Sequence, residues 1–222
     1  MINVIINAKN KWLCYSLAEI IKSVNKTKSS RALDITYDLT ASAVARADVI
    51  ILSLAPGEPY ICQRALFGKK YSCVVIIMIE TTEQPSGIRR PACLYGTIFI
   101  NKKITPGSLE SLIRGKWSDI VKYKSAIIAP DCNRCQHFRL NGIQSEISHL
   151  IRKDFDATEI SAILNMNIKT FYSHKYILMK KLGLKNTHDL CTFLKVYDDK
   201  IGIDTPGTLC KKKACIAYKS SL

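Results

Sequence analysis

Two short and almost entirely apolar stretches, residues 49–54 and 73–79, constrain the fold of this chain most strongly. The first is followed by Pro56-Gly57, a dipeptide typical of turns. A short apolar run that ends at turn residues indicates a strand buried on both faces, and such strands occur in parallel sheets with helices on each side. The sequence therefore predicts an α/β unit built around these two stretches.

Strand and helix patterns alternate through the whole first half of the chain, which indicates a doubly wound parallel sheet of five strands. The expected strands are residues 2–7, 33–37, 49–54, 73–79 and 97–100. The expected helices are residues 13–24, 41–46 (capped by Thr40), 60–67 and 106–116, the last with Leu109, Leu112 and Ile113 facing inward. Between residues 80 and 96, two prolines and a Ser-Gly pair argue against a regular helix.

The second half of the chain has a purely helical pattern, which predicts an all-α unit of four helices. Asn141 and Gln144 form a capping-box arrangement at the start of the first helix, and Asp156 caps the second. The expected helices begin at residue 142, span 157–164 and 168–182, and extend from 187 to about 197 behind the cap Asn186. In the second helix we expect Ile160, Ile163 and Leu164 to be buried.

The helix expected over residues 168–182 has two chemically different sides. Phe171, Leu178 and Leu182 form a side that can pack in a core. The other side carries a set of lysine and hydroxyl side chains, with Asn167 near its start. The set is Lys169, Thr170, Tyr172, Ser173, Tyr176 and Lys180. Such a helix, preceded by a short helix and a three-residue break, suits the major groove of DNA, where hydroxyls contact bases and lysines contact phosphates.

The charge of the chain favours the same interpretation. The formal net charge is +15 at pH 7, and basic residues outnumber acidic ones in both halves. A polyanion is the natural partner of such a chain, and nucleic acid is the commonest polyanion. The plainer alternative is an amphipathic helix whose basic side is merely solvated.

Residues 138–197 resemble the LuxR-type helix-turn-helix, and within that family the YSHK at residues 172–175 resembles Rcs-type auxiliary regulators. The residues that carry the likeness are Glu159, Ile160, Leu164, Met166, Lys169, Thr170, Phe171, His174, Leu178, Lys181, Leu182, Leu184 and Asn186. The resemblance implies that Tyr172, Ser173 and Tyr176 read bases and that Lys169, Thr170 and Lys180 contact the backbone. The chain departs from the family pattern at two places. Its first helix opens Leu140-Asn141-Gly142-Ile143-Gln144, and it has Tyr172 where a Lys or Arg is common.

Residues 48–57 resemble the third strand of response-regulator receiver domains, with Ser53 at the position of the phosphoacceptor aspartate. Lys102 matches the lysine that follows the fifth strand of receivers. Phosphoryl transfer on this scaffold needs a carboxylate at position 53 and acidic Mg²⁺ ligands after the first strand. Here Asn7, Ala8, Lys9 and Asn10 follow that strand. We therefore expect a pseudo-receiver without metal or cofactor, which serves dimerisation or partner docking.

The resemblance implies four segments: a receiver-like domain at residues 1–118, a linker at 119–138, a LuxR-type domain at 139–200 and a basic tail at 201–222. The expected function is a sequence-specific transcriptional regulator of double-stranded promoter DNA that acts as a homodimer or as a heterodimer with a related regulator. One alternative is an auxiliary regulator that works mainly through heterodimerisation. Another is a redox or zinc sensor that uses Cys132, Cys135 and His137.

The sequence gives no sign of enzymatic or membrane function. No Ser/His/Asp arrangement, phosphate-binding loop or dinucleotide fingerprint occurs, so we expect no catalytic residues. No apolar run reaches the roughly 18 residues that span a bilayer. The start of the chain also lacks the basic region of a secretory signal, and we expect a cytoplasmic protein without membrane contact.

Overall fold

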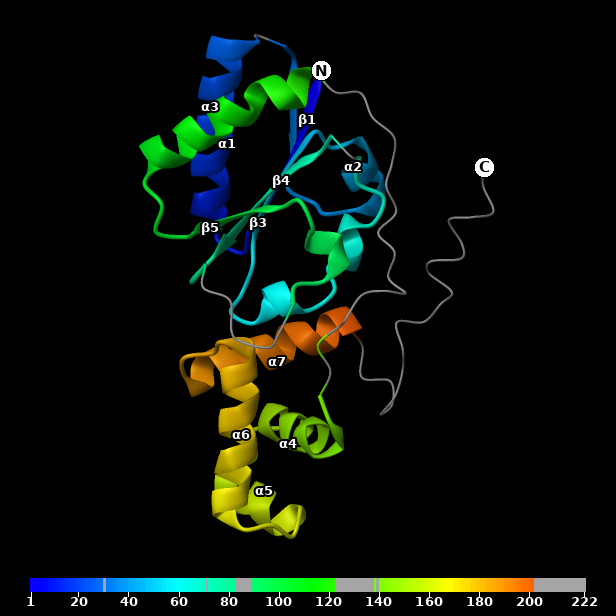
Figure 1. Ribbon diagram of the computed structural model, residues 1–222, viewed down its shortest axis with the longest axis vertical. Helices are drawn as coiled ribbons and strands as arrows, with labels where there is room; N and C mark the ends of the chain where they lie inside the picture. Colours follow the sequence, from blue (N-terminus) through cyan, green and yellow to red (C-terminus); the bar gives the residue numbers. More distant parts are fainter. Residues whose placement is uncertain (30, 71, 83–88, 123–137, 139, 202–222) are drawn as a thin grey trace, which may run out of the picture.

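The computed structural model describes residues 1–29, 31–70, 72–82, 89–122, 138 and 140–201. The first half of the chain forms a five-stranded sheet in the order β2-β1-β3-β4-β5, and all of its pairs are parallel (Figure 1). The strands are β1 (Ile2–Asn7), β2 (Leu33–Thr36), β3 (Val49–Ser53), β4 (Val74–Ile79) and β5 (Ile98–Asn101). The predicted five-stranded parallel sheet is confirmed, and each strand ends within a residue or two of its expected bounds.

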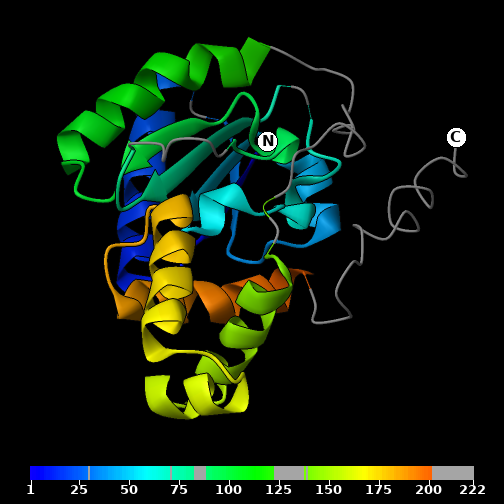
Figure 2. The same ribbon diagram turned by 60° about the horizontal axis from the view of Figure 1, so that its bottom comes forward.

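Helices cover both faces of this sheet, as expected for parallel strands. On one face lie α1 (Lys11–Lys28) and α3 (Pro106–Lys122), whose apolar residues form one core with β1, β3 and β4. Figure 2 shows these two helices on the same side of the sheet. On the other face lie α2 (Ala41–Arg46) and two single turns of 3-10 helix, η2 (Arg64–Leu66) and η3 (Ala92–Leu94). A third turn, η1 (Glu58–Tyr60), follows β3, and its Tyr60 packs in a core with residues of the second half of the chain.

The expected helix over residues 60–67 is wrong, because η1 and η2 stand in its place as separate turns. Gly57 adopts a left-handed conformation (φ 76°) ahead of Pro59, and the amide of Gln63 donates to the backbone oxygens of Glu58 and Ile61. In a continuous α-helix these oxygens would accept from the N–H groups four residues on. Here the Glu58 oxygen accepts from Ile61 N–H, three residues on, and the Gln63 side chain adds a donor to both oxygens, so the segment folds into two turns. Between residues 80 and 96 no regular helix was expected, and the described part of this segment contains only the single turn η3.

The second half of the chain forms four helices: α4 (Gly142–Arg152), α5 (Ala157–Ile163), α6 (Ile168–Leu182) and α7 (Thr187–Ile201). The predicted capping box is present, with the Asn141 side chain accepting from Gln144 N–H. The predicted cap Asp156 also forms a capping box, in which its side chain accepts from Glu159 N–H. The expected burial of Ile163 is wrong, since its side chain is 53% exposed. Ile163 is the last residue of the short α5, and Ile160 and the partly buried Leu164 already fill the contact with α6.

The predicted linker and the predicted basic tail lie only partly within the described residues. Helix α3 continues to Lys122, so its last turn lies in the stretch expected as a linker. Residues 123–137 and the tail 202–222 lie outside the described residues. Within the described ranges, no helix combines the length and apolar character needed to span a membrane.

Candidate nucleic-acid interface

Helix α6 has well-defined ends that follow from its sequence. The Asn167 side chain accepts a hydrogen bond from Lys169 N–H at 2.8 Å and so caps the start of the helix. Gly183 takes a left-handed conformation (φ 63°) at its end, where its N–H bonds to the oxygens of Met179 and Lys180. The turn before α6 includes Asn165, which also has a positive φ of 47° and accounts for the predicted break between α5 and α6.

One side of α6 is packed into the helical unit, as predicted. Phe171 joins Ile147 of α4 and Ile160 of α5 in a small core. Leu178 and Leu182 join a second core with residues of α7. The side of α6 that carries these three residues is therefore not available to a ligand.

The opposite side of α6 is exposed along its length, and it is called the recognition face below. Its members are the six residues expected to contact DNA, and every one of them is exposed: Lys169, Thr170, Tyr172, Ser173, Tyr176 and Lys180. Tyr172 is 53% exposed and Tyr176 is 64% exposed. Large aromatic side chains normally find a packed place, so two of them on one exposed helix face indicate a contact surface.

The recognition face is basic and polar at the start of the helix. No acidic residue lies in the first turn of α6. Asn167 accepts from the N–H groups of Lys169, Thr170 and Phe171, so the positive end of the helix dipole is capped by a neutral residue and not by a carboxylate. A helix start without a neighbouring negative charge favours a phosphate. The Ser173 hydroxyl donates to the backbone oxygen of Lys169 at 3.0 Å, which leaves its lone pairs available as acceptors.

Lys175 is a residue of this region that sequence reasoning did not single out. Its ammonium donates to the Thr187 hydroxyl at the start of α7 (2.9 Å) and lies 5.9 Å from the centre of the Tyr172 ring. Phe171 also contacts the Tyr172 ring edge-on, with 5.2 Å between the ring centres. These contacts hold the Tyr172 ring in place. The spacing of three residues between Tyr172 and Lys175 is the signal in the sequence that could have indicated this pair.

Ser53, the expected degenerate phosphoacceptor position, ends β3 at the carboxyl edge of the sheet and is half-buried. The strand order of this sheet places ligand sites at that edge, beside the crossover between β1 and β3. Lys102 at the end of β5 pairs with the carboxylate of Glu80 at 3.1 Å. Asn7 at the end of β1 donates to the backbone oxygen of Tyr37 at 3.0 Å. Among the residues that the structure describes, no group of three potential metal ligands occurs here or elsewhere.

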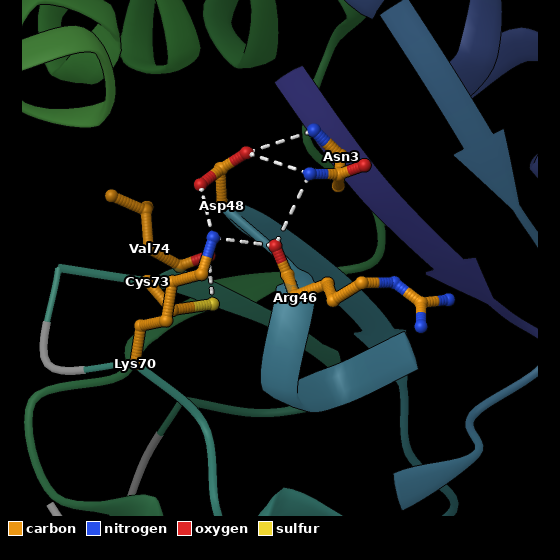
Figure 3. A network of polar contacts seen from close by, with 6 residues as sticks. All are labelled: Asn3, Arg46, Asp48, Lys70, Cys73 and Val74. Carbon is orange, nitrogen blue, oxygen red and sulfur yellow. Dashed lines mark hydrogen bonds and ion pairs between the residues drawn. The ribbon is translucent and has the colours of Figure 1, made fainter. Parts of the chain in front are cut away.

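Asp48, the acidic residue just before β3, stabilises the edge of the sheet opposite to Ser53. Asp48 accepts from Asn3 N–H (2.8 Å) and pairs with the Lys70 ammonium (2.8 Å), which also donates to the backbone oxygen of Arg46 (Figure 3). These bonds tie β1 and β3 to the segment before β4. Beside this network, burial raises the pKa of the Cys73 thiol to about 12, so Cys73 stays protonated and unreactive at neutral pH.

The proposed cysteine site cannot be followed in the structure, because Cys132, Cys135 and His137 lie outside the described residues. Of the described cysteines, Cys14, Cys62, Cys73 and Cys93 are buried and Cys191 is partly buried. None of these five forms a disulfide. The described part of the chain therefore adds nothing to the redox or zinc alternative.

No protein-family model and no curated protein matches the chain. Among solved structures, it is similar to RcsB from Salmonella enterica serovar Typhimurium bound to promoter rprA, with 23% identity over 87% of this chain and 98% of that chain and a TM-score of 0.46. A two-component response regulator RcsB–DNA complex has 20% identity over 91% and 99% of the chains and a TM-score of 0.48. FixJ from B. japonicum has 11% identity over 87% and 95%, with a TM-score of 0.34. None of these TM-scores reaches 0.5, so the likenesses do not by themselves assign a function to this chain.

Proposed function

We propose that this protein is a sequence-specific DNA-binding transcriptional regulator whose receiver-like domain is not phosphorylated in the usual way. The observation that carries the proposal is the recognition face, a continuous exposed stripe of two tyrosines, two hydroxyl residues and two lysines on a helix packed by its other side. Residues at positions 169, 172, 173, 176 and 180 recur every three or four residues, so they lie on one side of α6 and can enter a groove together.

The chemistry of this face suits a division of tasks on duplex DNA. Tyr172 and Tyr176 present hydroxyls that can donate to and accept from base edges. Ser173 donates to the backbone oxygen of Lys169, so its hydroxyl can accept from a base. Lys169 and Lys180 flank them and can neutralise phosphates, and Thr170 adds a hydrogen bond at the start of the helix. A helix whose basic side is merely solvated would have the same geometry. Measurements of DNA binding therefore separate that alternative from a DNA-reading helix.

Replacement of Tyr176 by alanine is expected to weaken binding to the target promoter by about tenfold or more, since one good base contact contributes about 1–3 kcal/mol. Binding to unrelated DNA should change little, because that binding depends on phosphates. Fluorescence anisotropy with both DNAs measures the two affinities. Tyr95→Ala is the matched control, because Tyr95 is 66% exposed but lies in the receiver-like domain. Equal affinities for Tyr176→Ala and the unmodified protein would refute the recognition face.

A small acyl phosphate with Mg²⁺ is expected to leave both the mass of the protein and its affinity for DNA unchanged. Ser53 offers a hydroxyl where an acyl phosphate intermediate needs a carboxylate, and Lys102 is paired with Glu80. The variant Ser53→Asp should also stay unlabelled, because Asn7, Ala8, Lys9 and Asn10 supply no acidic metal ligand after β1. Intact-protein mass spectrometry and anisotropy test both points. An added phosphoryl mass on the unmodified chain would contradict the proposed pseudo-receiver.

A second candidate function, regulation mainly by pairing with another regulator, is favoured by one feature of the receiver-like domain. Trp12 and Tyr15 of α1 and Tyr37 after β2 stand in a row, with ring centres 6.4 and 6.5 Å apart. They are 82%, 58% and 43% exposed. Exposed aromatic clusters of this kind are typical of protein–protein contacts, where Trp and Tyr contribute most of the binding energy. The partner proposed for this aromatic surface is a second receiver-like domain.

If the aromatic surface forms such a contact, Trp12→Ala should raise the dissociation constant of the dimer by about tenfold or more. Sedimentation velocity over a range of protein concentrations measures this constant. Tyr95→Ala again serves as the control, since it removes another exposed ring (66% exposed) elsewhere on the same domain. An unchanged dissociation constant of the dimer in Trp12→Ala would exclude the aromatic surface as the pairing site.

A further inference from the structure

The receiver-like domain and the helical unit share one apolar core, and this contact is called the interdomain seat below. Tyr60 and Ile61, which are 5% and 0% exposed, enter it from η1 at the carboxyl edge of the sheet. From the helical unit come residues of the end of α6, of the turn after it and of α7. These are Leu178, Leu182, Leu184, Leu190, Phe193, Leu194 and Val196. The contact therefore joins the two parts of the chain by buried side chains.

The fit of the seat is close at Gly57. A Cβ atom added at this position would stand 2.6 Å from Cδ2 of Phe193 and 3.2 Å from Cδ2 of Leu184. Gly57 also has a positive φ of 76°, so both its backbone and its surroundings select glycine. Because Phe193 is fully buried, it has little room to move away.

The seat is also connected to the sheet through Tyr60. The guanidinium of Arg90 lies 3.6 Å from the centre of the Phe99 ring in β5. Burial raises the pKa of the Tyr60 hydroxyl, although the charge of Arg90 and a hydrogen bond with it act in the opposite direction. Tyr60 is therefore neutral at physiological pH. Its contacts with Arg90 link β5 to the helical unit without a group that titrates near neutrality.

The seat leaves the recognition face open. In Figure 1, α7 and the end of α6 lie next to the receiver-like domain, whereas α5 and the start of α6 lie at the far end of the molecule. Figure 2 shows the same arrangement from a second direction. Tyr172 and Tyr176 are 53% and 64% exposed in the whole chain, with the receiver-like domain present. Contact between the domains and access to the recognition face are therefore compatible.

From these observations we propose that the interdomain seat is a permanent and permissive contact: the receiver-like domain holds the helical unit in one orientation with the recognition face free. A contact of this kind replaces the switch that phosphorylation would operate at the same edge of the sheet. The part of this inference that concerns DNA rests on the proposed function, and the part that concerns the contact between domains does not.

Gly57→Ala in the full-length protein tests the contact, and hydrogen–deuterium exchange measures it peptide by peptide. The added methyl group should raise exchange by about tenfold or more in residues 184–194, which belong to the other domain. Gly96→Ala is the matched control, because Gly96 also has a positive φ (72°) but no atom lies within 4 Å of an added Cβ. The control should disturb its own turn and leave residues 184–194 unchanged. Unchanged exchange there in Gly57→Ala would overturn the seat.

Two further measurements complete the test. Tyr60→Ala opens the seat without backbone strain, so it should raise exchange in residues 184–194 even if Gly57→Ala folds poorly. The affinity of both variants for promoter DNA should stay the same or fall. A rise of about tenfold or more would show that the contact is inhibitory and would overturn the permissive part. Failure of Tyr176→Ala to weaken binding would instead refute the proposed function and leave the exchange result intact.

Discussion

The affinity of this protein for DNA is expected to fall by on the order of 10²-fold when the salt concentration rises from 50 to 200 mM. This loss is typical of a protein that neutralises about four phosphates, because each lysine that binds a phosphate releases a condensed counterion. A dimer that uses Lys169 and Lys180 of both recognition faces would neutralise four, whereas the neutral Thr170 adds a hydrogen bond without releasing a counterion. Anisotropy titrations at several salt concentrations give the slope of log affinity against log salt. A slope near zero would contradict phosphate binding altogether.

Single lysine variants assign this slope to positions on α6. Lys169→Gln and Lys180→Gln should each reduce the magnitude of the slope by about one for each DNA-bound copy and weaken specific and unrelated DNA alike. Lys28→Gln is the charge-matched control, since Lys28 is an exposed residue in the last turn of α1, in the other domain. If Lys28→Gln changed the slope as much as the α6 variants do, binding would depend on overall charge and not on the recognition face.

The second large effect is expected for Phe171→Ala, which should lower the free energy of unfolding of the helical unit by about 3–5 kcal/mol. Phe171 is 3% exposed, and the core that it forms contains few other fully buried side chains, among them Ile147 and Ile160. A cavity there cannot be filled by neighbouring side chains without moving α4 or α5. Urea unfolding followed by circular dichroism at the helix band measures the loss, and DNA binding should disappear with it.

The adjacent residue provides the control for this change. Tyr172→Ala also removes an aromatic ring from α6, but that ring is 53% exposed and its main contact is edge-on with Phe171. Its cost in stability should not exceed about 1.5 kcal/mol, whereas its effect on promoter binding should be as large as that of Tyr176→Ala. Equal losses of stability in the two variants would mean that the two sides of α6 are assigned wrongly.

The sequence predicted those parts of the fold whose causes are local. Short apolar strands, the caps Thr40, Asn141 and Asp156, and the two sides of α6 all follow from residues close to one another in the chain. The helix predicted for residues 60–67 was wrong because a helical pattern cannot show that the Gln63 amide donates to the backbone oxygens of Glu58 and Ile61.

Sequence patterns did not predict contacts between residues that are far apart in the chain. The stacking of Arg90 on Phe99, the effect of Arg90 on the pKa of Tyr60 and the approach of Gly57 to Phe193 involve residues that only the tertiary fold brings together. The exposure of Ile163 has the same origin, because it depends on which neighbours reach the end of α5. In the candidate interface, the six residues of the recognition face were found by spacing, whereas the support that Lys175 gives to Tyr172 was not.

The pairing of Lys102 with Glu80 has a consequence for how such a protein can be controlled in a cell. Because the Lys102 ammonium is paired with the Glu80 carboxylate, a dianion attached at this edge of the sheet would have to compete with Glu80 for that cation. A regulator that is not phosphorylated at that edge, as proposed above, would have no covalent on and off forms there. Its output would track how many copies are synthesised and degraded, and which companion subunits are present at the time.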